Sequence, residues 1–221
     1  DRVLVRNLTA GTTLFDQSYY LNPVADTNGP IAPGQARQRS ASFRLPDGPA
    51  GAGNIEVALF LDSGNRVFEF REGADAEANN TTNLTRSSTV ALYPDLAVSN
   101  VGAPGTGLPG QPLEVSWTVA NNGAAPTPAA WTDQVFLVDD ANPGAAQLLG
   151  SFNFGETLAT GQSSNVTRTV TLPFFTVGTR RVAVRANSGP AFYEPDLANN
   201  FVQSASTLTL SPRLELTLNR T

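Results

Sequence analysis

The chain has 221 residues, a net charge of −5 and no cysteine, histidine, lysine or methionine. This composition excludes disulfide bonds, thiol and Schiff-base chemistry and His-based catalytic triads, and it removes the usual zinc ligands. Neither half carries the basic patch that nucleic acid or an anionic membrane requires, and no apolar run approaches the ~20 residues that span a bilayer. An acidic, lysine-free chain rich in Ala, Gly, Pro and Thr is typical of a secreted prokaryotic protein.

The sequence repeats itself with a period of about 118 residues. Five short segments return in the same order later in the chain. They are 15–21 with 132–138, 31–35 with 158–162, 43–46 with 170–173, 78–80 with 198–200, and 88–94 with 206–212. Each repeat has the size of a domain, so the pattern predicts an array of modules. The predicted modules are 1–94 and 95–212, and 213–221 is expected to begin a third.

In the second module, short alternating apolar runs predict strands. Leu113, Val115, Trp117 and Val119 alternate with polar or small residues, which is typical of a strand with one buried face. The other predicted strands cover 96–101, 134–138, 148–154, 166–172, 179–185 and 208–210. Asn121-Asn122-Gly123 is expected to form a turn, because these residues tolerate positive φ. About seven strands predict tandem antiparallel β-sandwiches of immunoglobulin type, with a seven- or eight-stranded barrel as the alternative.

The first module matches this pattern only in part. Val3–Val5 is expected to take the place of the Trp117 strand, and nothing ahead of it supplies an equivalent of 96–101. At the other end, the alternating residues Leu214, Leu216 and Leu218 match the strand that follows Asp95. The sequence therefore predicts a first module that lacks its first strand, and a tail that carries a strand of the same kind.

The motifs of the second module resemble those of a known family. They are D-L-x-V from Asp95, G-Q-x-L-x-V-x-W-x-V-x-N-x-G from Gly110, W-x-D from Trp131, L-P at Leu172 and N-N at Asn199. In this order, over 95–212, they resemble the CARDB family, the cell-adhesion-related domain found in bacteria. The resemblance implies immunoglobulin-like sandwiches in tandem arrays on large secreted or surface-anchored prokaryotic proteins, and it implies no catalytic residues.

The sequence contains few of the residue types that enzymes use for catalysis. The catalytic arrangement still open to it is a carboxylate pair of the kind that hydrolyses glycosides, with Glu69, Asp133 and Glu194 as candidates. Nothing in their spacing brings two of them together, so we expect the protein not to be an enzyme.

The acidic loop of the first module is the densest group of oxygen ligands. Asp62, Glu69, Asp75 and Glu77 are candidate ligands for calcium, which takes 6–8 oxygens. A solvated acidic loop is the alternative, and no other cofactor is expected. Asp16 and Asp133 occupy matching positions in the repeat, where either a turn-capping role or calcium ligation is expected.

The two tryptophans are expected to differ in role. Trp117 lies on the apolar face of its strand and is expected to be the core tryptophan of the sandwich. Trp131 stands at the start of a strand, where its ring would either stack on a sugar ligand or pack at the rim of the core.

These observations predict a non-enzymatic structural module of an extracellular prokaryotic fibre, sheath, surface layer or adhesin. The expected partners are other copies or adjacent repeats, joined end to end. The candidate assembly residues, on the first module and on a tail that donates its strand to the next copy, are Val3, Val5, Leu214, Leu216 and Leu218. Alternatively, the chain is part of a longer polypeptide in which the missing strand of the first module lies just upstream of Asp1. The alternative functions are an adhesin module that binds surface glycans or another surface ligand, and an accessory domain of a larger secreted enzyme.

Overall fold

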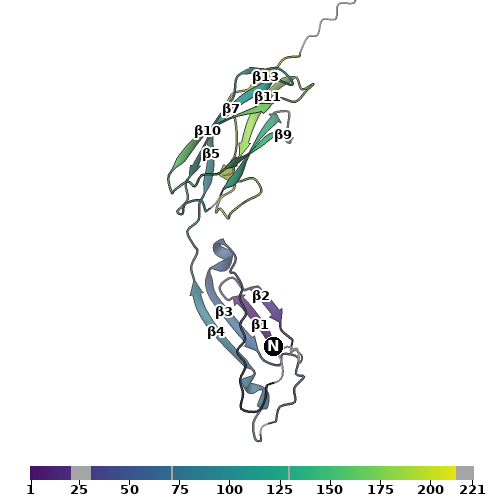
Figure 1. Cartoon of the computed structure of the whole chain (residues 1–221), viewed down its shortest axis with the longest axis vertical. Coiled ribbons are helices and arrows are strands. Elements are labelled where there is room, and N and C mark those ends of the chain that lie inside the picture. The colour runs from purple at the N-terminus through teal and green to yellow at the C-terminus, as the bar shows by residue number, and fades with distance from the viewer. Residues whose placement is uncertain (21–30, 71, 129, 213–221) are drawn as a thin grey trace, which may run out of the picture. The chain divides into compact units, whose positions relative to one another are not determined.

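The computed structural model describes residues 1–20, 31–70, 72–128 and 130–212 (Figure 1). The chain is all-β, as predicted, and it divides into two compact units, Asp1–Ala91 and Leu92–Thr221. This division falls close to the predicted boundary after Pro94. Among the described residues, no helix has the length and apolar character that crossing a bilayer requires.

Unit 2 is a β-sandwich. One sheet has the strand order β10-β7-β5, and the other has the order β6-β13-β11-β8-β9, with β12 beside β11. Figure 1 shows β5, β7 and β10 on one side of the unit and β9 and β11 on the other. The strands are β5 (Leu96–Gly102), β6 (Thr106–Gly107), β7 (Pro112–Asn121), β8 (Trp131–Asp139), β9 (Asn142–Phe154), β10 (Ser163–Thr171), β11 (Gly178–Arg185), β12 (Phe201–Gln203) and β13 (Leu208–Leu210).

The alternation read from the sequence builds the core of unit 2. Leu113, Val115, Trp117 and Val119 are all buried, while Glu114 between them is exposed. β7 is the central strand of its sheet and pairs antiparallel with both β5 and β10. Each of the seven predicted strands is therefore present, and the immunoglobulin-like sandwich is confirmed.

The predicted turn follows β7 directly, and close packing explains its glycine. Gly123 has no positive φ, so conformational freedom is not what this position requires. A Cβ at Gly123 would lie 2.4 Å from the carbonyl oxygen of Tyr93 and 2.5 Å from the amide nitrogen of Asp95. The glycine is required because the turn packs directly against the backbone that leads into β5.

Unit 1 is a single antiparallel sheet with the strand order β2-β1-β3-β4. β1 is a central strand, since it pairs with β2 along one edge and with β3 along the other. Its elements are β1 (Arg2–Asn7), β2 (Thr12–Ser18), the 3-10 turn η1 (Gly48–Gly51), β3 (Gly53–Phe60), the 3-10 turn η2 (Ala76–Asn79) and β4 (Thr81–Ser88). Figure 1 shows these strands as one layer.

The strand register of unit 1 corrects the predicted alignment of the two modules. β1 pairs with β3 as β8 pairs with β11. The matching pairs are Val3–Leu59 with Val135–Val184, and Val5–Val57 with Leu137–Val182. The prediction that Val3–Val5 takes the place of the Trp117 strand is therefore wrong. The same register puts Asp1, rather than Asp16, at the place of Asp133.

The loops that follow β3 and β11 support this register. Asp62 and Asn187 follow these strands at matching positions, and both have positive φ, 40° and 46°. The amide of Leu61 donates to the carbonyl of Asn80 at 2.7 Å, and the amide of Ala186 donates to that of Asn200 at 2.9 Å. Each loop then reaches a 3-10 turn, η2 or η3 (Ala198–Asn200), that leads into β4 or β12.

Unit 1 therefore corresponds to one sheet of unit 2. Its strands match β9, β8, β11 and β12, and no strand among the described residues of unit 1 matches β5 or β7. Residues 35–46, which the sequence aligns with β10, belong to no strand. The physical reason is that β10 pairs with β7 in unit 2, and unit 1 offers no such partner.

Candidate functional site

A buried carboxylate joins the two sheets of unit 2. Asp133 lies on β8, is 1% exposed and accepts hydrogen bonds from both tryptophans of the chain. The indole Nε1 of Trp117, on β7 in the facing sheet, donates to Oδ2 at 3.0 Å, and that of Trp131 donates to Oδ1 at 2.8 Å. Asp133 is therefore a tether between the sheets, and not the turn cap that the sequence suggested.

Burial dominates the electrostatics of this carboxylate. Removal from water disfavours the charged form and raises the pKa of Asp133 to about 6, although the two indoles and the backbone amide of Asn187 favour the ionised form. The carboxyl group therefore titrates near neutral pH. Its hydrogen-bond partners are the two core indoles and the amide of Asn187, so it links buried elements of the sandwich.

A second buried carboxylate fastens the first strand of the sandwich. Glu194 is 4% exposed and accepts the backbone amide of Leu96, the first residue of β5. Its Oε1 accepts the side-chain amides of Asn187 at 2.6 Å and Asn200 at 2.8 Å. Glu194 thus ties the β11–β12 loop to the start of β5, although the two are about 100 residues apart in sequence.

Asn121, the last residue of β7, completes the same end of the unit. Its side chain is fully buried and makes four hydrogen bonds. Oδ1 accepts the amides of Asp95 at 3.1 Å and Gly123 at 3.0 Å, and Nδ2 donates to the carbonyls of Ala125 at 2.8 Å and Leu158 at 3.0 Å. One amide side chain therefore links three segments of unit 2: the residue that precedes β5, the β7–β8 connection and the β9–β10 connection.

Replacing Asn121 with alanine is expected to lower the free energy of unfolding of unit 2 by about 2–3 kcal/mol, because buried backbone donors and acceptors lose their partner. Tryptophan fluorescence during urea unfolding measures this directly, since both tryptophans lie in unit 2. Asn165→Ala is the matched control, since Asn165 lies exposed on β10 and bonds only the Thr118 hydroxyl. Equal shifts for both variants would contradict the prediction.

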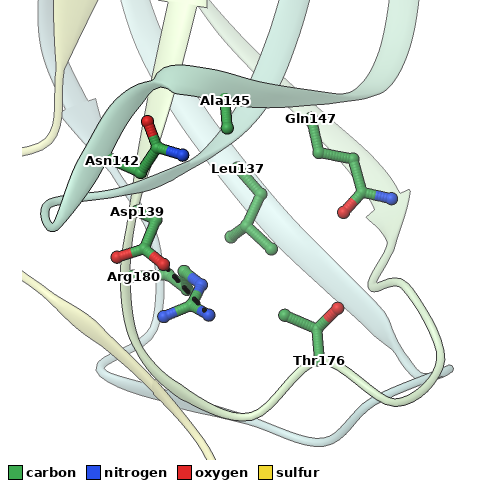
Figure 2. Close-up of a pocket in the computed structure, with 7 residues that line it drawn as sticks. All are labelled: Leu137, Asp139, Asn142, Ala145, Gln147, Thr176 and Arg180. Carbon is green, nitrogen blue, oxygen red and sulfur yellow. Dashed lines mark ion pairs between the residues drawn. The ribbon is translucent and has the colours of Figure 1, made fainter.

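A pocket of unit 2 between β8, β9 and β11 is small, and its charged side chains pair with each other. It has a volume of about 220 Å³, less than the usual size of a small-molecule site. Figure 2 shows Arg180 beside Asp139, with Thr176 and Gln147 on the opposite side; the ion pair between Arg180 and Asp139 spans 3.3 Å. The ion pair satisfies the two charged side chains that line the pocket.

The candidate calcium ligands of unit 1 accept hydrogen bonds from residues of the same loop. The amides of Arg66 and Val67 donate to the carboxylate of Asp62, and these bonds lower its pKa. Asp75 caps η2 by accepting the amide of Glu77 at 3.0 Å. Among the described residues, no three acidic side chains lie close enough to share a metal ion. Calcium binding therefore stays a prediction, and the structure does not gather its proposed ligands.

Asp16 and the other acidic candidate of this loop have local partners as well. Asp16 lies on β2, and its carboxylate accepts Nε and Nη2 of Arg2 at 2.7 and 2.6 Å. Glu69 Oε1 accepts the side-chain amide of Asn80 at 3.5 Å. The expectation that Asp16 caps a turn is therefore not met, because Asp16 pairs across the β1–β2 hairpin.

Trp131 is a core residue. Its ring is 2% exposed and stacks on Phe154 with a centroid separation of 4.3 Å, while Phe192 meets its edge at 6.2 Å. A ring in this position offers no face to a sugar, so the packing interpretation describes it. Trp117 is also buried, as expected.

The assembly candidates divide between two places. Val5 is fully buried and Val3 is half-buried on β1, whose two edges are both paired. A strand from another molecule therefore cannot join beside Val3–Arg6, which corrects that part of the prediction. Leu214, Leu216 and Leu218 lie outside the described residues.

The polar tethers of unit 2 were only partly visible in the sequence. The sequence indicates Asn121 only as part of a turn and Glu194 only as a candidate for a carboxylate pair, and it does not single out Asn187. One signal was present: Asp62-Ser63-Gly64 and Asn187-Ser188-Gly189 follow β3 and β11 at matching positions. A polar residue followed by Ser-Gly marks a left-handed backbone position, which Asn and Asp tolerate better than most residues.

The sequence matches the model of one protein family. The family model described as CARDB matches residues 93–204, slightly more than half of the chain. No curated protein matches the sequence.

Among solved structures, the chain is similar to a CARDB domain from Pyrococcus furiosus. The crystal structure of that domain, in complex with di-metal ions, is 18% identical, with 56% of this chain and 95% of that chain covered and a TM-score of 0.41. Its solution structure is 17% identical, with 53% and 95% covered and a TM-score of 0.40.

A similar segment occurs in a much larger protein. β-Glucosidase 3B from Thermotoga neapolitana is 17% identical over 53% of this chain and 16% of that chain, with a TM-score of 0.37. The match to the family model, in contrast, extends from Tyr93 to Ser204 and includes strands of both sheets of unit 2. On this ground the chain belongs to the CARDB family.

Proposed function

We propose that this protein is a non-enzymatic structural module of an extracellular prokaryotic fibre, sheath, surface layer or adhesin, and that it works by joining CARDB modules end to end. The single observation that carries the proposal is unit 1, a sheet for which no facing strands exist among the described residues. A sheet with one apolar face is stable only when that face is covered. Joining to further strands is therefore part of how this protein works.

The local similarity of the two units supports the proposal of a tandem array. The segment from β3 through η2 to β4 matches the segment from β11 through η3 to β12 in strand register, loop hydrogen bonds and 3-10 turn. One module design used twice is the pattern of a repeat array. In such an array, the end of each module contacts the start of the next module, and the length of the array increases with the number of modules.

Strand donation by 213–221 is the proposed route to a fibre. Because both edges of β1 are taken, the acceptor in the next copy is the segment 35–46, around Phe43, which belongs to no strand. Backbone hydrogen bonds would provide affinity, and the alternating Leu214, Leu216 and Leu218 would cover the apolar face. Contacts of this head-to-tail kind produce filaments when the rotation between copies does not close.

Light scattering on a dilution series tests the route. The full chain is expected to show a mass that rises with concentration, and the chain ending at Pro212 is expected to remain a monomer. The control keeps the length and replaces Leu214, Leu216 and Leu218 with serine, which should also abolish assembly. A full chain that is monomeric at every concentration, or a truncated chain that still assembles, would exclude donation by the tail.

A further inference from the structure

We infer that the apolar face of unit 1 takes a pair of antiparallel strands of the β5–β7 type, led by a segment like Tyr93-Pro94-Asp95-Leu96. The inference rests on the proposed function, because it names the partner that completes unit 1. It goes further by identifying two strands instead of one, and by assigning the residues that hold them.

One face of the unit 1 sheet is apolar and incompletely covered. Val3, Val57 and Leu59 share this face and are only half-buried, and Leu84 beside Val57 is 50% exposed. In unit 2, the residues that match Val3, Val57 and Leu59 in register are each fully buried beneath β5, β7 and β10.

The opposite face of the same sheet is more polar and carries two ion pairs. It carries the ion pairs of Arg2 with Asp16 at 2.6 Å and of Arg6 with Glu56 at 2.5 Å. The added strands therefore belong on the face of Val3 and Leu84, which is the side that β5 and β7 cover in unit 2.

The acceptor for the first added strand is already in place. Glu69 follows Asp62 at the spacing at which Glu194 follows Asn187, and each glutamate receives the side-chain amide of the second asparagine of an Asn-Asn pair. In unit 2, the other oxygen of the glutamate accepts the amide of Leu96 at the start of β5. Glu69 is thus the positioning residue for the equivalent amide of the partner.

Two further groups of unit 1 stand where unit 2 holds its strands. Phe68 is 89% exposed, and it matches Tyr193, whose ring meets Tyr93 edge-on at 4.5 Å just before β5. Asp1 matches Asp133, which accepts the indole of Trp117 on β7, and in unit 1 its carboxylate forms an ion pair with Arg39. An aromatic residue ahead of the first strand therefore has its receiving group in unit 1, and an indole on the second strand would take the place of Arg39 at Asp1.

A single donated strand would cover only part of this face. In unit 2, β5 pairs only with β7, and β10 pairs only with β7, so β7 is the strand that joins the sheet together. A lone β5-type strand would have only the β10-like segment 35–46 as a neighbour, and a lone β7-type strand would leave Glu69 and Phe68 without their contacts. The geometry of unit 1 thus fits two consecutive strands.

The test supplies those strands. Residues 93–132 are fused directly ahead of Asp1 of the full chain, so that Asp1 follows Thr132 as Asp133 does. The readout is trypsin cleavage at Arg37, Arg39 and Arg44, which are exposed in the segment that matches β10. Fusion is expected to slow cleavage at these three arginines by about 10-fold or more, since a paired strand must open before it is cut. The matched control is the same fusion with serine at the positions of Leu113, Val115, Trp117 and Val119, which should give no protection.

The variant Glu69→Ala tests whether protection from trypsin depends on the contact at Glu69 or only on the presence of an extra segment. In the fused chain it is expected to remove part of the protection, and in the unfused chain it should leave the cleavage rate unchanged. Equal cleavage in the fusion and its serine control would overturn the inference, whatever the state of assembly. Protection by the fusion, together with unchanged assembly through 213–221, would instead overturn the proposed strand-donation route and leave the inference standing.

Discussion

Replacing Asp133 with leucine is expected to destabilise unit 2 by about 3 kcal/mol, the largest effect of any single side chain discussed. Leucine has a similar shape but no acceptor, so the indole N–H groups of Trp117 and Trp131 and the amide of Asn187 would all remain buried without a partner. Each orphaned donor costs about 1–3 kcal/mol, and removal of a buried charge offsets part of the sum. Urea unfolding followed by tryptophan fluorescence measures the loss.

A second variant separates orphaned donors from poor packing. Trp131→Phe combined with Asp133→Leu removes one of the indole N–H groups, while phenylalanine keeps an aromatic ring next to Phe154. The double variant is therefore expected to recover about 1 kcal/mol relative to Asp133→Leu. Asp16→Leu, which breaks an exposed ion pair in unit 1, should leave the tryptophan-detected transition where it was. An unchanged midpoint for Asp133→Leu would show that the tether contributes nothing.

The sandwich of unit 2 was predictable because alternation is a local property. Leu113 through Val119 must place one side toward an apolar core, and this constraint can be read without knowing which strand lies opposite. The same applies to the strand ends, where Gly and Pro interrupt the pattern. The class of fold and the seven strands of unit 2 therefore follow from short segments taken one at a time.

The register of unit 1 was not predictable in the same way. Asp16-Gln17 and Asp133-Gln134 are the same dipeptide, and that similarity drew the alignment. The identity of a strand in a sandwich depends on the strand it pairs with, and for β1 that partner is β3, about 50 residues away. Short dipeptides carry no information about such a pairing, so the segment of Asp16 was aligned with β8 instead of β9, and Val3–Val5 was in consequence assigned to the sheet of β7.

The buried polar tethers depend on convergence in space. Asp133 accepts one indole from its own strand and one from the facing sheet, and Glu194 accepts an amide from the start of β5. An aspartate ahead of a strand is most often a turn cap, and a glutamate in a loop is most often solvated. Only the packing of the two sheets removes these carboxylates from water and gives them their donors.

The contribution of Asp133 to the stability of unit 2 is expected to fall by about 3 kcal/mol as the pH rises from 4 to 7. The pKa of Asp133 is about 6 in the folded protein and 3.8 in the unfolded chain, so the folded state binds the proton more tightly. A group with a raised pKa contributes its stability below the unfolded pKa and loses it as the pH rises through the folded pKa. Two pKa units correspond to about 3 kcal/mol.

Asp133→Asn isolates this contribution, because asparagine does not titrate in this range. The difference in unfolding free energy between the two proteins, followed by tryptophan fluorescence from pH 4 to pH 7, is expected to change steadily through pH 6. Other carboxylates affect both proteins alike and cancel in that difference. The direction of the change decides between two opposed effects: burial favours the neutral acid, and the two indoles favour the carboxylate. A wild-type advantage that grows with pH would mean that the indole hydrogen bonds outweigh burial, and Asp133 would then be a charged tether at every pH at which the protein is folded.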